Sequence, residues 1–114
     1  MSKLNPGEIA IILEDEERIL KPTLRALSAI SGRFNGLARA RQALVDQDLD
    51  ATVFIIRHGL NMTDREAKNL PQVVFENGLT EELVIPLIKY TAILANGGKP
   101  LPDQPEDEST EGNE

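Results

Sequence analysis

Apolar residues follow two different periods along this chain, and the change from one to the other predicts its elements. The segment Ile9–Leu13 alternates between two faces and is rich in β-branched residues, which is typical of a strand. We expect a turn over Glu14 to Glu17 and a second short strand over Arg18 to Lys21. Pro22 ends that strand because it has no N–H group to donate to a neighbouring strand.

Helical periodicity begins directly after this proline. Leu24, Leu27 and Ile30 recur at intervals of three, which places them on one helical face. Thr23 precedes them and can cap the helix, because its hydroxyl can accept a hydrogen bond from a free backbone N–H. Gly32 is the expected end of this helix.

The middle of the chain predicts two more helices. One begins at Gly36 and ends at about Val45, and Asp48 or Asp50 can cap the next. Residues 52–58 have the composition of a buried strand, yet their apolar positions recur at helical intervals and a glycine follows them. We predict a helix there, with the strand as the open alternative.

Capping signals and prolines predict where the helices in the last part of the chain begin, break or bend. The segment Thr63–Glu66 has the pattern of a capping box, and we expect a kink or break at Pro71 before the helix ends at Gly78. The final helix spans Thr80–Asn96, and Pro86 is expected to bend it. These patterns predict an α+β fold that is mostly helical: an N-terminal two-stranded β-hairpin followed by about five helices in a small bundle.

Charge separates a folded region from a tail. The chain of 114 residues has a net charge of −7, and six acids with no base lie between Leu101 and Glu114, so residues 1–100 are close to neutral. We therefore expect one hairpin-plus-helices domain over residues 1–98. Residues 99–114 are expected to form a disordered acidic tail, because they have too little apolar surface to offset the entropy of ordering.

The last predicted helix has an unusually wide apolar face. A surface helix normally carries an apolar stripe of about 100°, whereas only Glu82, Lys89 and Asn96 form a polar strip here. This helix is either the centre of the core or a helix that contacts the core and also a partner or a second copy of the chain. On the second interpretation, the predicted partner-binding residues are Leu83, Leu87, Tyr90 and Leu94.

Residue patterns for catalysis, metal binding or cofactor binding do not emerge from the sequence. The chain has no cysteine and one histidine, His58, which has no neighbour in the sequence suited to acid–base catalysis. The acids of "EDEE" lack the spacing of a calcium loop. We predict no enzymatic activity, no catalytic residue, no metal and no cofactor. Arg33, Arg39 and Arg41 could line a basic patch for nucleic acid. Nucleic acid is nevertheless a disfavoured partner, because the chain as a whole is acidic.

The order of these segments resembles a known family. "RILKPTLRAL", "DLDATVFIIRHGL", "ENGL" and a last apolar helix ending in "NGG" are similar to the small tail assembly chaperones of long-tailed phages and gene transfer agents, over roughly Pro6 to Gly98. Similar proteins tend to have a glycine in the hairpin turn, where this chain has Asp15 and Glu16. Because that pair disfavours positive φ, we expect a longer turn or a type I turn.

This resemblance implies a non-enzymatic protein that coats the apolar tape measure protein before the tail tube assembles, with the tail tube protein as a further partner. It implies a location in the host cytoplasm. No apolar run approaches the roughly 20 residues that span a bilayer. A structural virion component, such as a tube or adaptor subunit, and a small DNA-binding regulator are the alternative functions.

Overall fold

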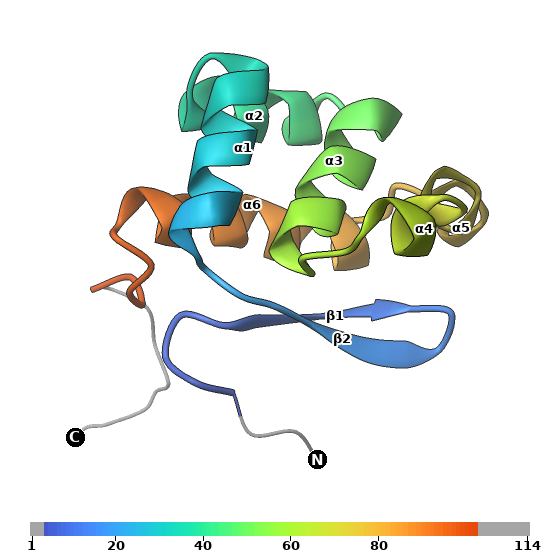
Figure 1. Cartoon of the computed structure of the whole chain (residues 1–114), viewed down its shortest axis with the longest axis horizontal. Coiled ribbons are helices and arrows are strands. Elements are labelled where there is room, and N and C mark those ends of the chain that lie inside the picture. Colours follow the sequence, from blue (N-terminus) through green and yellow to red (C-terminus); the bar gives the residue numbers. More distant parts are fainter. Residues whose placement is uncertain (1–3, 103–114) are drawn as a thin grey trace.

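One long helix lies between a β-hairpin and a layer of three helices. The computed structural model describes residues 4–102. The final helix, α6 (Glu81–Ala95), contacts the hairpin on one side and helices α2 (Leu37–Val45) and α3 (Leu49–Gly59) on the other. Helix α1 (Leu24–Phe34) packs against α2 and α3, while the short α4 (Asp64–Ala67) and α5 (Leu70–Asn77) lie at one end (Figure 1). The predicted fold class is confirmed: a hairpin is followed by five helices and one single-turn helix.

The hairpin pairs strand β1 (Ile9–Leu13) with strand β2 (Glu16–Leu20) in antiparallel register. Leu13 pairs with Glu16, so the loop consists of Glu14 and Asp15 alone, with φ values of 53° and 63°. Positive φ at both positions is typical of a type I′ turn, whose twist matches that of the strands. The predicted four-residue turn and the predicted longer or type I turn are therefore wrong, because the strand twist overrides the preference of these two side chains for negative φ.

Side-chain caps fix the helix starts as predicted. Thr23, Asp48 and Thr80 each accept a hydrogen bond from a backbone N–H in the first turn of the following helix. The segment 52–58 belongs to α3, which confirms the helical alternative. The first helix does not end at Gly32, because α1 continues to Phe34 and Asn35 closes it in the left-handed conformation. Asparagine tolerates this conformation better than most residues.

The two prolines have different effects on their helices. The chain leaves helical geometry after Ala67, and α5 then starts with Pro71 in its first turn, where the missing N–H costs nothing. The predicted break is thus confirmed. Pro86 lies inside α6, which continues through it to Ala95.

The acidic tail predicted for residues 99–114 falls mostly outside the described residues. Residues 103–114 are not described. In the part that is, the Asn96 side-chain amide donates hydrogen bonds to the carbonyl oxygens of Lys99 and Pro100, each at 3.1 Å. The chain around residues 99 and 100 is thus attached to the end of α6.

A close junction joins the hairpin to the helices. The Lys21 N–H donates to the carbonyl oxygen of Gly59 at 3.0 Å, and the Tyr90 hydroxyl donates to the Lys21 carbonyl oxygen at 2.6 Å. A Cβ atom at Gly59 would lie 2.6 Å from Leu20 Cδ2 and 3.3 Å from the Tyr90 ring. Only glycine therefore lets the end of α3 approach β2 and α6 this closely.

Replacing Glu14 and Asp15 by Asn and Gly should raise the free energy of unfolding by about 1 kcal/mol, because Asn-Gly adopts positive φ with less strain. Urea denaturation of the double variant measures the change. A lower stability than that of the original chain would contradict the type I′ turn.

Gly59→Ala should lower the free energy of unfolding by about 1–3 kcal/mol, because the new methyl group overlaps Leu20 and Tyr90. Gly32→Ala is the matched control: it is also helical, and a Cβ there meets nothing within 4 Å. It should raise stability by about 0.5–1 kcal/mol. Equal effects of the two substitutions in urea denaturation would contradict the close junction.

Candidate functional site

The four predicted partner-binding residues lie in the hydrophobic core. Leu83, Leu87, Tyr90 and Leu94 are at most 3% exposed, because the hairpin covers one side of α6 and helices α2 and α3 cover the other. A partner cannot reach these side chains while α6 stays in place, so the structure corrects their expected docking role. Burial also raises the pKa of Tyr90, whose hydroxyl is used in the junction with Lys21.

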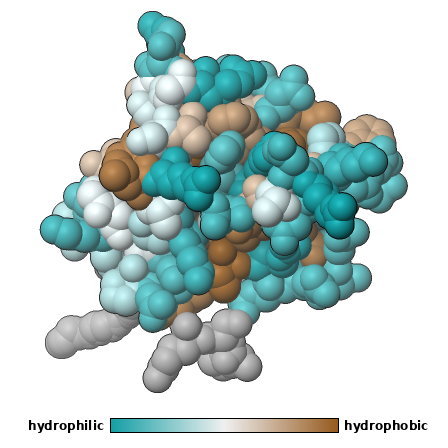
Figure 2. All heavy atoms as spheres, in the orientation of Figure 1, coloured by the Kyte–Doolittle hydropathy of each residue, from teal (hydrophilic) through white to brown (hydrophobic). Residues whose placement is uncertain are grey.

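The outer face of the hairpin is one of the apolar surfaces that remain accessible; Leu24, Phe75 and Ile85 are exposed on the helices. Residues directly opposite each other in an antiparallel pair point to the same face. Ile11 and Leu13 are buried against the helices, so Ala10 and Ile12 point outward, and Ile19 does so through its pairing with Ala10. Ile12 is 56% exposed. The exposed Glu17 lies on the same face, opposite Ile12. We call the apolar residues of this face, Ala10, Ile12 and Ile19, the outer hairpin face. Figure 2 shows hydrophobic atoms reaching the surface among hydrophilic ones in the lower part of the view, where the hairpin lies.

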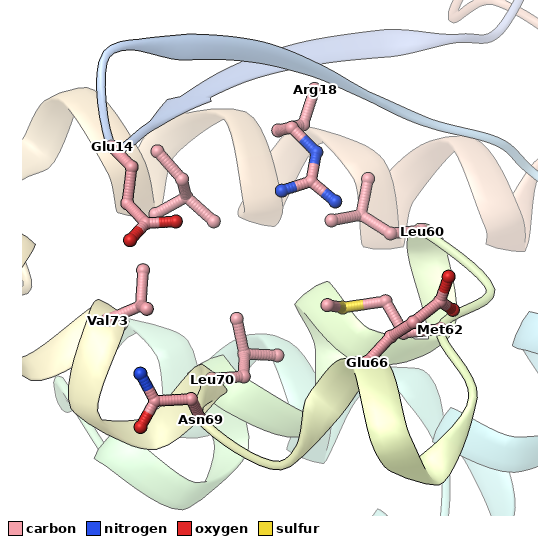
Figure 3. Close-up of a pocket in the computed structure, with 9 residues that line it drawn as sticks. Glu14, Arg18, Leu60, Met62, Glu66, Asn69, Leu70 and Val73 are labelled. Carbon is pink, nitrogen blue, oxygen red and sulfur yellow. The ribbon is translucent and has the colours of Figure 1, made fainter.

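A pocket of about 360 Å³ lies on the inner side of the hairpin, between the hairpin and helices α4 and α5. Figure 3 shows Arg18 pointing into it from β2 and Glu14 reaching in from the turn. Its floor is apolar and its rim is polar; the apolar residues are Leu13, Leu60, Met62, Leu70 and Val73, and the polar ones are Glu14, Arg18, Glu66 and Asn69. An apolar floor with a charged rim suits one side chain or a short apolar segment of a protein partner.

Two further hollows flank Ile12 on the side of α5 and α6. Ile12 and Asn77 line both of them, with volumes of about 360 and 250 Å³. The side chain of Ile12 therefore stands between depressions on the surface. A partner that covered Ile12 could fill these depressions and gain shape complementarity.

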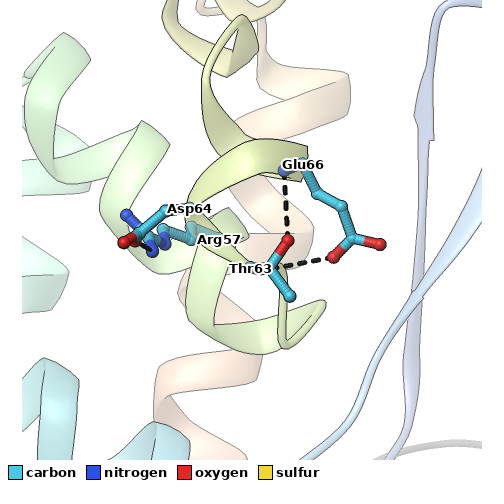
Figure 4. A network of polar contacts seen from close by, with 4 residues as sticks. All are labelled: Arg57, Thr63, Asp64 and Glu66. Carbon is cyan, nitrogen blue, oxygen red and sulfur yellow. Dashed lines mark hydrogen bonds and ion pairs between the residues drawn. The ribbon is translucent and has the colours of Figure 1, made fainter.

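Helix α4, which forms one wall of the pocket lined by Arg18 and Glu66, is held by local polar contacts. The capping box predicted for Thr63–Glu66 is present: the Thr63 N–H donates to Glu66 Oε1 at 2.8 Å, and the Glu66 N–H donates to Thr63 Oγ1 at 3.2 Å (Figure 4). Arg57 forms an ion pair with Asp64. Glu66 thus fixes the start of α4 and also lines the pocket, so its carboxylate is positioned before any partner binds.

His58 belongs to an aromatic and cationic cluster on α1 and α3. Its ring lies 4.4 Å from that of Phe54, which in turn meets Phe34 edge to face at 5.9 Å, and the Arg33 guanidinium lies over both phenylalanine rings. Burial, together with the charges of Arg57 and Arg25, lowers the pKa of His58 below its ordinary value of 6.5. The Arg33 guanidinium is therefore engaged in stacking with Phe34 and Phe54.

Metal and membrane features were also sought in the described part of the chain. Within residues 4–102, no three His, Asp or Glu side chains gather closely enough to hold a metal ion. None of the helices described is long and apolar enough to cross a membrane. Comparison of the chain with protein-family models, with curated proteins and with solved structures finds no match.

Sequence reasoning did not identify the outer hairpin face: its candidate partner residues lay on the last helix, which it also interpreted as the centre of the core. The signal was present in the strand itself, since Ile12 is a large apolar residue on the face opposite Ile11 and Leu13. In a half-buried strand that position is usually polar. The apolar outward residue was the better indication of a partner surface than the wide apolar face of a helix in the core.

Stability should fall as the pH drops from 7 toward 5.5, with part of that fall due to His58. The unfolded chain binds a proton near pH 6.5, whereas the folded chain resists it because the pKa of His58 is lowered. His58→Gln removes this contribution, so its unfolding free energy, measured in urea, should depend less steeply on pH over that range. If the unfolding free energies of the variant and the original chain changed equally with pH, the result would contradict the contribution assigned to His58.

Proposed function

We propose that this chain is a non-enzymatic assembly chaperone of the phage-tail type, which acts in the host cytoplasm and covers apolar segments of the tape measure protein. The observation that carries the proposal is the outer hairpin face, where Ile12 is 56% exposed between two surface hollows. The resemblance of the sequence to tail assembly chaperones supports the choice of partner.

The hairpin suits contact with a long, repetitive partner for a physical reason. In the described residues the sheet has two strands, so each strand has one edge without a strand neighbour, and such edges can pair with an extended segment. The apolar outer face can meanwhile cover a hydrophobic side of the same partner. Neither contact requires a reacting group, and both shield a surface that would otherwise aggregate.

The negative charge of the chain supports the same role. A net charge of −7 on 114 residues favours solubility and mutual repulsion between complexes. A chain that covers apolar segments of a long protein with one face, and presents acidic groups elsewhere, keeps that protein dissolved until assembly. The tail tube protein is a second proposed partner, because it must meet the same complex when the tube forms.

Co-expression with the longest coiled-coil-like protein encoded just downstream should yield a soluble complex on size-exclusion chromatography, with that protein insoluble when expressed alone. Ile12→Asp should abolish the complex, because it places a charge on the apolar contact, while circular dichroism shows an unchanged fold. The matched control is Val45→Asp: Val45 is 49% exposed at the end of α2, on the side of α6 away from the hairpin.

Two results would contradict the proposed function. One is loss of the complex with Val45→Asp as well as with Ile12→Asp, which would show that added charge alone causes the effect. The other is the presence of this chain in stoichiometric amount in purified particles by mass spectrometry, which would instead support a structural virion component.

A further inference from the structure

The register of the hairpin fixes which backbone groups are left free at its edges. In a hairpin closed by a two-residue turn, the pair that flanks the turn is hydrogen-bonded, and such pairs alternate with pairs that are not. Leu13 and Glu16 flank the turn here, so the N–H and C=O groups of Ala10 and Ile12 point away from β2. The N–H of Lys21 agrees with this alternation, because it points away from β1 and donates to the end of α3.

The two edges of the hairpin differ in what lies beside them. The edge of β2 leads into Lys21, whose N–H is bonded to the Gly59 carbonyl oxygen, so an extended segment on that side would meet the end of α3. Within residues 4–102, no group outside the hairpin forms a hydrogen bond with the backbone of Ala10 or Ile12. The edge of β1 is therefore the one along which a further strand can be added.

The surroundings of the β1 edge indicate what kind of segment it accepts. Ile12 is 56% exposed and lines two hollows, of about 360 and 250 Å³, on the side of α5 and α6. Ile85, which follows Glu82 on α6 by about one turn, is 57% exposed. The charged residues that line the two hollows are all acids, namely Glu14, Asp15, Glu76 and Glu82. Exposed apolar side chains and carboxylates thus lie together here, with no base among the lining residues.

We propose that the edge of β1 at Ala10 and Ile12 binds an extended partner segment in which apolar and basic residues alternate. The backbone of this segment completes the hydrogen bonds that these two residues leave free. Because the side chains of a strand alternate between two faces, its apolar residues lie beside Ile12 and its basic residues point toward Glu76 and Glu82. This inference rests on the proposed function, since it names the edge and the segment chemistry by which the partner is held.

Charge favours such a partner over a second copy of this chain. Two β1 edges use all their free groups when Ala10 of one copy lies opposite Ile12 of the other in an antiparallel pair. That register sets Glu8 of each copy opposite Glu14 of the other, and like charges directly opposite each other destabilise a pair of strands. A basic segment meets the same carboxylates with opposite charge.

Amide hydrogen exchange with a probe peptide tests the edge directly. The probe is a blocked peptide of alternating lysine and valine, slightly longer than the five residues of β1, and its control has glutamate in place of lysine. Excess lysine–valine peptide should slow exchange of the Ala10 and Ile12 amides by about tenfold or more, because these N–H groups become hydrogen-bonded. Exchange of Ile19, on the β2 edge, should not change, and the glutamate–valine peptide should have no effect.

Matched variants at one position separate the backbone edge from the side chains. Ala10→Pro removes an N–H that points away from β2, which an edge strand tolerates, and it should abolish protection of Ile12 by the peptide. Ala10→Val keeps this N–H and should retain the protection. If circular dichroism shows that Ala10→Pro is unfolded, the double variant Glu76→Lys, Glu82→Lys supplies the test: its preference should shift from the lysine–valine to the glutamate–valine peptide.

Three results would overturn the proposal. The first is unchanged exchange of Ala10 and Ile12 in excess lysine–valine peptide. The second is protection of Ile19 in their place, which would assign the segment to β2. The third is protection that arises without peptide and grows with the concentration of the chain, which would assign the edge to a second copy.

The co-expressed complex keeps this proposal distinct from the proposed function. A complex that forms equally well with folded Ala10→Pro would remove the edge contact and keep the chaperone role. Protection of Ala10 and Ile12 by the peptide, with no complex formed by the original chain, would keep the edge contact and remove the chaperone role.

Discussion

The main chain at Lys21 is held from both sides, and the placement of the hairpin depends on it. Its N–H donates to the Gly59 carbonyl oxygen at the end of α3, and its carbonyl oxygen accepts from the Tyr90 hydroxyl in the middle of α6. Each such hydrogen bond contributes about 1 kcal/mol, and more is lost if one buried partner remains unsatisfied. Because Gly59 has no side chain, Leu20 and the Tyr90 ring can fill the space beside it. Three segments far apart in the sequence therefore meet at one residue.

This junction decides which surface is left for a partner. It presses the inner face of the hairpin onto α6, so most of the wide apolar face of that helix is used within the core, although Ile85 is 57% exposed. Ile12, on the face that points away from the helices, is one of the large apolar residues that remain accessible, with Leu24, Phe75 and Ile85 on the helices. The hairpin is thus a rigid platform with one covered and one open face. The chaperone role proposed above rests on this open face.

Local signals predicted most of the fold, and contacts between distant residues explain what they missed. Thr23, Asp48, Thr63 and Thr80 are caps that act within four residues, so the sequence alone locates their helices. The turn at Glu14 and Asp15 was missed because strand twist imposes positive φ on residues that do not prefer it. The candidate surface was misplaced because the hydrogen bond between Tyr90 and Lys21 spans 69 positions, and no periodic pattern shows which side of a wide apolar helix a hairpin will cover.

Amide hydrogen exchange of the free chain tests the central claim, that the hairpin is fixed to the helices as one cooperative unit with an open outer face. The account predicts that the hydrogen-bonded amides of β1 and β2, with that of Lys21, exchange with the same free energy of opening as those in the middle of α6. That energy should match the global free energy of unfolding from denaturation. Fast exchange of the hairpin while α6 stays protected would contradict the account, because the hairpin would then open independently and could not hold a fixed surface for a partner.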